Sequence, residues 1–237
     1  GYTLLLATGG HAVAAAMMDK LSYDPVRSFQ PVSTVTYFPF LLVVRADSPW
    51  RSLQDLLAAA RVKPEAVSYG SAGIGTTHHL AGELLARMAQ LKLLHVPYRG
   101  DAASVTALLG AEVPFVIAPA TAVESHVRAG KLRALATTGP RRWSAMPELP
   151  TVAEQGVAGY DVRSWAGWML PAGASASVVQ RLNETTQQAL QNAEVRARLQ
   201  QMGGEPQGST PQEMQAMLVA EIDKWKKLVA DSGIPKT

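Results

Sequence analysis

The stretch from Val67 to Leu85 constrains the fold more than any other part of this sequence. A short β-prone run leads into three closely spaced glycines, Gly70, Gly73 and Gly75, and an apolar pattern of helical period then begins at Leu80. This order predicts a strand, a glycine loop and a helix. Thr76 or Thr77 stands where a hydroxyl can cap the helix.

Such a loop is suited to an anion, because glycines let the backbone approach a ligand and the first N–H groups of a helix point toward it. Phosphate and carboxylate both fit this description. The Walker A spacing from Gly70 to Gly75 is followed by Thr76 instead of lysine, and the dinucleotide fingerprint fails because His78 stands at its last glycine. A structural turn without a ligand is the remaining alternative.

The rest of the chain alternates strand and helix patterns, which predicts a largely parallel α/β sheet. After a strand over Tyr2 to Ala7, the segment Thr8-Gly9-Gly10-His11 is expected to form a second glycine loop that feeds a helix over 12–18. Further strands are expected over 32–35, 40–44, 93–98, 113–117, 132–137 and 165–171, and further helices from Ser52, over 102–109 with Asp101 as cap, and over 121–128, 151–155, 176–202 and 211–232.

Composition excludes several classes of function. The formal charge of +3 is mild and scattered, so no nucleic-acid partner is expected. Cysteine is absent and the five histidines have no metal-binding spacing, so we expect neither a metal site nor a cofactor. No run of about 18 apolar residues predicts a membrane span. The chain starts at Gly1 without methionine or signal peptide, and we therefore expect processed or partial material.

Several short motifs occur together in a particular order. They are Gly1-Tyr2-Thr3-Leu4-Leu5, Tyr23-Asp24-Pro25, Tyr69-Gly70-Ser71-x-Gly73-x-Gly75-x-x-x-His79-Leu80-x-x-Glu83, Pro97-Tyr98-Arg99-Gly100, Ala129-Gly130-Lys131-Leu132-Arg133-Ala134-Leu135-Ala136 and Pro150-Thr151-x-x-Glu154-x-Gly156. In this order they resemble one family, the Bug or TctC-like solute-binding proteins of tripartite tricarboxylate transporters.

The resemblance implies an α/β protein with the two-domain, type II periplasmic-binding-protein (Venus-flytrap) fold. Domain one would comprise residues 1–98 and 170–237, and domain two residues 99–169. The first strand, loop and helix of the family would lie before Gly1, so we expect domain one to lack them. The ligand site would be the inter-domain cleft.

The resemblance also implies a periplasmic, non-enzymatic receptor for a small carboxylate, which passes its ligand to transporter membrane subunits and meets the membrane only through them. In the family, main-chain amides of two loops in the first domain hold one carboxylate together with ordered water, and the second of these loops corresponds to Gly70–Thr77. The residues expected to bind the ligand are Thr8, Gly9, Tyr37, Gly70, Ser71, Ala72, Gly73, Gly75, Thr76, Thr77, His79, Tyr98, Arg99 and Gly100.

Alternatives stay open at the level of residues and of function. His79 could bind the ligand, its water or a loop carbonyl, or could be a core histidine that holds the loop. His78 is expected at the surface, and Arg99 and Arg163 are either cations for a second carboxylate or solvated side chains. A carboxylate-sensing module is the alternative function. A hydrolase is disfavoured because the sequence has no G-x-S-x-G elbow.

Overall fold

The computed structural model describes residues 3–236 and divides the chain into two compact units. The first unit comprises Gly1–Phe38 and Ser164–Thr237, and the second comprises Pro39–Arg163. These boundaries differ from the expected ones: the sequence predicted that residues 39–98 belong to domain one, whereas here they belong to the second unit. The reason is strand pairing: β3 (Ser68–Ser71) hydrogen-bonds to β4 (Leu94–Pro97) and β5 (Phe115–Pro119), which keeps 39–98 with the segment that follows.

Strands of the first unit pair in an antiparallel manner. In this unit β1 (Leu5–Thr8) pairs with β7 (Arg163–Pro171), and β8 (Glu205–Pro206) pairs with the first part of β2 (Phe29–Arg45). The strand β2 is one continuous element of 17 residues, where two strands separated by Tyr37-Phe38-Pro39 were expected. Its residues 29–38 belong to the first unit and its residues 39–45 to the second.

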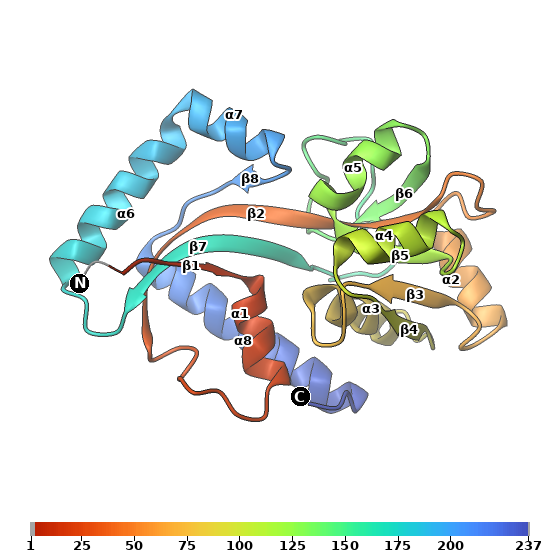
Figure 1. Cartoon of the computed structure of the whole chain (residues 1–237), viewed down its shortest axis with the longest axis horizontal. Helices are drawn as coiled ribbons and strands as arrows, with labels where there is room; N and C mark the ends of the chain where they lie inside the picture. The colour runs from red at the N-terminus through yellow and green to blue at the C-terminus, as the bar shows by residue number, and fades with distance from the viewer. Residues whose placement is uncertain (1–2, 237) are drawn as a thin grey trace. The chain divides into compact units, whose positions relative to one another are not determined.

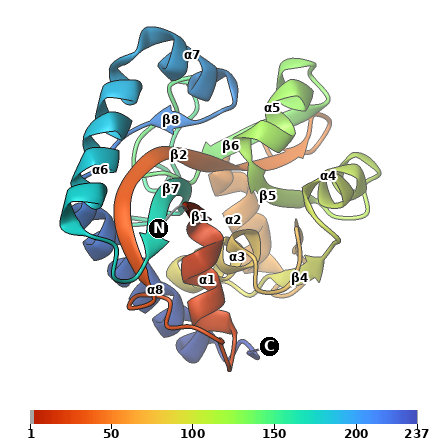
Figure 2. The same cartoon turned by 60° about the vertical axis from the view of Figure 1, so that its left-hand side comes forward.

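Helices of the first unit come from both ends of the chain. The N-terminal helix α1 (Gly9–Met17) packs against the C-terminal helix α8 (Pro211–Ser232), as Figure 1 and Figure 2 both show. The expected helix over 176–202 is two helices, α6 (Ala176–Gln191) and α7 (Ala193–Gln201), because the Asn192 side chain caps the second. The buried Trp165 ring donates its Nε1–H to the Glu221 carboxylate of α8, which ties β7 to that helix.

The second unit contains a mixed sheet in which β6 (Leu132–Thr137) and β5 both pair antiparallel with β2, while β3 pairs parallel with β5 and with β4. The expectation of a largely parallel sheet is therefore correct only for the three strands β5, β3 and β4. Their carboxyl ends meet at one edge of the sheet. The central strands are fully buried apolar runs, with Leu41, Leu42 and Ile117 at zero exposure.

Four helices cover this sheet: α2 (Leu53–Val62), α3 (Thr77–Met88), α4 (Asp101–Leu109) and α5 (Ala120–Arg128). The sheet order is β5, β3, β4, so the connection from β3 to β4 runs in one direction across the sheet. The connection from β4 to β5 runs in the opposite direction and passes β3. Right-handed crossovers then require α3 and α4 to lie on opposite faces, and Figure 1 shows them on opposite sides of β3. Ligands of α/β sheets bind where such connections diverge, outside the carboxyl ends of the strands.

Local sequence signals explain several elements and fail at others. Ser52 and Asp55 form the capping box that starts α2. Residues 151–155, expected as a short helix, form turns instead, and Gly100 rather than Asp101 is the N-cap of α4. Across residues 3–236, no helix combines the length and the hydropathy that crossing a bilayer requires.

Candidate functional site

The predicted glycine loop lies between β3 and α3 in the second unit, not in the first domain where the resemblance placed it. Gly73 and Gly75 have φ of +132° and +70°, a region that side chains with a Cβ rarely adopt. Thr76 caps α3: its hydroxyl accepts from His79 N and donates to Gly73 O at 2.8 Å. The prediction of a strand, a glycine loop and a helix capped by Thr76 or Thr77 is confirmed, with Thr76 as the cap.

A second loop, Tyr98-Arg99-Gly100, lies directly beside the first. Tyr98 N donates to Ser71 O at 3.0 Å, and Gly100 N donates to Ala72 O at 3.1 Å. These bonds continue the parallel ladder of β3 and β4 beyond the strand ends. The structure therefore brings together Gly70 to Thr77, His79 and Tyr98 to Gly100, all of which the sequence singled out.

Hydrogen bonds inside the loop decide which backbone donors remain for a ligand. Gly73 N donates to Ser71 Oγ at 3.0 Å, and Gly75 N donates to His79 Nδ1 at 3.2 Å. Within the described residues, four other amides donate no hydrogen bond, those of Ala72, Ile74, Thr77 and His78. The last two belong to the first turn of α3, where the helix dipole favours an anion.

Tyr69 and Gly82 fix the helix against the strand. A Cβ on Gly82 would lie 2.2 Å from the Tyr69 ring, so only glycine allows this approach of α3 to β3. The buried Tyr69 hydroxyl donates toward His79 O at 3.0 Å and Glu83 Oε1 at 2.8 Å. Burial raises the pKa of the Glu83 carboxyl, although its bond from Tyr69 acts in the opposite direction.

Two histidines lie under the loop. The rings of His79 and His95 stack with centroids 3.9 Å apart, and burial lowers the pKa of each to about 4. Both imidazoles are therefore neutral at pH 7. His79 Nδ1 accepts from Gly75, which places the His79 proton on Nε2. The sequence alone did not indicate His95, because its contact with Ser71 joins residues 24 positions apart.

His78 is not at the surface as expected, since its side chain is only 13% exposed. Its Nε2 lies 2.8 Å from Asp101 Oδ1 at the start of α4, and its ring contacts Phe40 edge-on. Arg99 is exposed, and Arg163 pairs with Asp161 at 3.2 Å. The anion-binding potential of these loops therefore comes from backbone N–H groups and helix dipoles, with Arg99 as the exposed cation of the second loop.

The predicted residues Thr8, Gly9 and Tyr37 belong to the first unit. The expected second glycine loop is absent there, because Thr8 is the N-cap and Gly9 the first residue of α1. Gly9 is buried against Ser164, whose Oγ would lie 3.1 Å from an added Cβ. Tyr37 stands opposite Glu205 in the pairing of β2 with β8.

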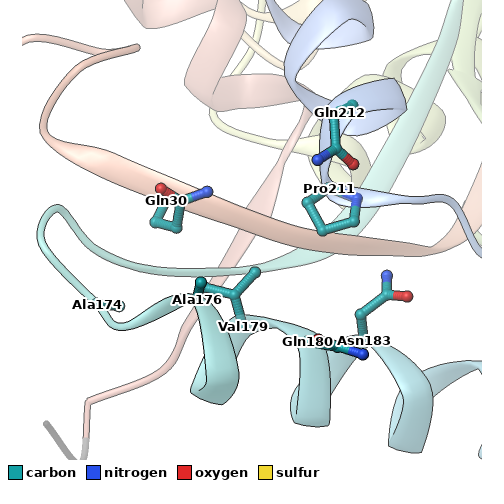
Figure 3. Close-up of a pocket in the computed structure, with 8 residues that line it drawn as sticks. All are labelled: Gln30, Ala174, Ala176, Val179, Gln180, Asn183, Pro211 and Gln212. Atoms are coloured by element: carbon teal, nitrogen blue, oxygen red, sulfur yellow. The ribbon is translucent and has the colours of Figure 1, made fainter.

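A hollow in the first unit, shown in Figure 3, contains none of the predicted site residues. It measures about 430 Å³ and is lined by Gln30, Ala174, Ala176, Val179, Gln180, Asn183, Pro211 and Gln212. The Asn183 side-chain N–H groups already bond to the protein, since Nδ2 donates to Val32 O and Ser209 O, both at 2.8 Å. In the described residues, no group of three or more His, Asp or Glu side chains is arranged to hold a metal ion.

An α/β protein of two units, with a glycine loop and a helix N-terminus at the carboxyl ends of its parallel strands, has the architecture of a solute-binding protein. The family model described as the tripartite tricarboxylate transporter family receptor, TctC, matches residues 1–234. The chain belongs to this family, as its motifs predicted.

Individual relatives agree with this assignment. The chain is 37% identical over 232 residues to a UPF0065 protein from the tcbD-tcbE intergenic region of Pseudomonas sp. strain P51, covering 98% of this chain and 69% of that protein. It superposes on R. palustris Rpa4515 with adipate at a TM-score of 0.87 and 35% identity, and on the periplasmic binding protein BugD at 0.83 and 29%. Both comparisons cover 100% of this chain and 80% of the other. The expected periplasmic-binding-protein fold is confirmed.

Proposed function

We propose that this chain is a periplasmic receptor that captures a small organic dicarboxylate and delivers it to the membrane subunits of a tripartite transporter. The observation that carries the proposal is the set of backbone N–H groups at Ala72, Ile74, Thr77 and His78, which have no acceptor within the described residues. One carboxylate of the ligand accepts hydrogen bonds from this set at the N-terminus of α3. Adipate is the ligand of one similar structure, which supports a dicarboxylate here.

Neutral donors suit a receptor because the ligand must also leave. A carboxylate held by backbone amides is stabilised by charge-assisted hydrogen bonds without a permanent ion pair. Arg99 and Gly100 stand on the neighbouring loop, and the exposed Arg99 guanidinium attracts an anion toward the two loops. In this arrangement the backbone amides of the loop bind the carboxylate, and Arg99 at the surface attracts it.

The pair formed by Ser71 and His95 serves binding rather than catalysis in this proposal. Their Oγ and Nε2 atoms are 2.6 Å apart, as in a nucleophile and its base. Ser71 is fully buried, however, and its hydroxyl is already bonded to Gly73. Burial together with the nearby His79 lowers the pKa of His95 to about 4, so it is a weak base at pH 7.

Isothermal calorimetry with adipate, its monomethyl ester and adipamide tests the proposal. The dianion should bind, the monoester more weakly, and the uncharged diamide should give no heat, because only a carboxylate gains from the helix dipole. A melting-temperature scan gives a second readout, since a ligand at about 100 times its Kd adds roughly 2.7 kcal/mol to the free energy of unfolding. Binding of the diamide as strongly as adipate, or of a nucleotide alone, would contradict the carboxylate site.

A further inference from the structure

Two histidines, the buried His79 and the half-buried His95, each contact the loop through one ring nitrogen. His79, from α3, accepts Gly75 N–H on Nδ1 at 3.2 Å. His95, from β4, places Nε2 at 2.6 Å from Ser71 Oγ, and the same oxygen accepts Gly73 N–H at 3.0 Å. The two rings stack at an interplanar angle of 16°. The Gly75 N–H is therefore held by His79 directly, and the Gly73 N–H is held by Ser71 Oγ, which His95 contacts.

We propose that His79 and His95 are positioning residues of the carboxylate site. By keeping the N–H groups of Gly73 and Gly75 hydrogen-bonded within the protein, they leave the amides of Ala72, Ile74, Thr77 and His78 for the ligand. This inference rests on the proposed function and assigns residues that determine the affinity of the same site. Neither imidazole contacts the ligand in this arrangement.

The chemistry of the pair fits this role. Only a neutral imidazole has a free lone pair, so His79 must be uncharged to accept from Gly75. Burial keeps both rings neutral, and the titratable side chains in contact with them are those of Tyr69 and Glu83. Glu83 Oε1 lies 3.9 Å from His79 Nε2, on the side of the ring that carries the proton. Stacking then fixes the orientation of both rings, because rotating one ring would separate it from the other.

Amide side chains can separate positioning from simple packing. The Asn amide oxygen can occupy nearly the position of His Nδ1, and the polar end of Gln nearly that of His Nε2. His79→Asn therefore preserves the acceptor for Gly75, and His79→Gln displaces it. At the other ring the order reverses, since His95→Gln preserves the partner of Ser71 and His95→Asn does not.

The experiment measures Kd for adipate by calorimetry and melting temperature for these four variants. His79→Asn and His95→Gln should bind within about threefold of the parent, whereas His79→Gln and His95→Asn should lose about tenfold, the value of one hydrogen bond of about 1.4 kcal/mol. In these two variants the loss of affinity for adipate should be larger than the fall in melting temperature would account for. Equal affinity in all four variants, or affinity that follows melting temperature alone, would overturn the proposal.

A measurement without ligand separates this inference from the proposed function. Amide hydrogen exchange at Gly73 and Gly75 in the ligand-free protein should stay slow in His79→Asn and His95→Gln, and should accelerate at Gly75 in His79→Gln and at Gly73 in His95→Asn. If adipate gives no heat with the parent but this exchange pattern holds, the carboxylate proposal fails and the positioning of the loop stands. If exchange is unchanged in all variants, the positioning role is wrong.

Discussion

Two segments of this chain follow the same sequence logic but have different structures. Thr8-Gly9-Gly10-His11 and Gly73 to His79 both follow a β-prone run and precede a helical pattern. In the first unit the helix begins at Gly9 and no loop forms, whereas in the second unit Gly73 and Gly75 take positive φ and form one. The difference is one of backbone conformation: Gly9 and Gly10 lie within α1, whereas Gly73 and Gly75 take φ values that a right-handed helix does not contain.

The histidines of the two segments differ in the same way. His11 Nε2 lies 2.7 Å from Pro25 O, and its ring stacks on Tyr23 with Phe29 edge-on. His79 turns back to the loop in front of its own helix and accepts from Gly75. A histidine near a helix start can therefore anchor a distant segment or shape the adjacent loop, depending on the partners that the fold supplies.

Among the changes that test this difference between the two segments, replacing Gly73 by Val should have the largest effect on ligand binding. A β-branched residue at φ of +132° is strained by about 1 to 3 kcal/mol, and relief of that strain rotates the neighbouring amides. We expect the affinity for adipate to fall by about 100-fold, measured by calorimetry. Thr76 should still cap α3, so circular dichroism should show a folded protein. Unchanged affinity would mean that the loop amides are not the ligand donors.

Gly100→Pro tests the neighbouring loop. Proline removes the N–H that donates to Ala72 O, and it fixes φ near −65° where Gly100 has +92°. We expect about a tenfold loss of affinity, because the loop after β3 loses its lateral support. Gly100→Ala, which keeps the N–H but strains φ, should give an intermediate loss. Equal losses in both variants would assign the effect to φ alone.

Acidification should destabilise the second unit through its histidine pair. Each imidazole has a pKa of about 4 in the folded protein and about 6.5 when unfolded, so the unfolded chain binds more protons between these values. The free energy of unfolding should therefore fall as the pH drops from 7 to 5, by about 2 kcal/mol per histidine. Glu83 opposes this trend, since burial raises its pKa.

Urea denaturation at several pH values measures this slope. His79→Asn removes one of the two titrating rings and should flatten the curve between pH 7 and 5, while His11→Asn in the first unit provides the matched control. A slope that is identical in the parent and His79→Asn would show that other groups determine the acid sensitivity.

Much of this fold could be predicted because its signals are local. The capping residues Ser52 and Thr76 and the breaker Gly130 mark helix ends through their own side chains or φ. The path of β2 through Pro39 and the contact of Ser71 with His95 could not be predicted, because both depend on pairing between residues far apart in the sequence. Of the site, the loop was predictable and its supporting histidine His95 was not.

Gly10→Ala should produce the smallest effect of these changes. It should stabilise the protein, whereas the other changes weaken binding or stability. Gly10 lies inside the first turn of α1, and an added Cβ would meet Thr8 Oγ1 at 3.5 Å, which is an ordinary contact. Because alanine loses less backbone entropy than glycine on entering a helix, the free energy of unfolding should rise by about 0.5 kcal/mol, measured by urea denaturation. Affinity for adipate should not change. A loss of affinity in this variant would instead indicate that the start of α1 takes part in binding, as the sequence predicted for Thr8 and Gly9, and the two glycine segments would then share a function despite their different structures.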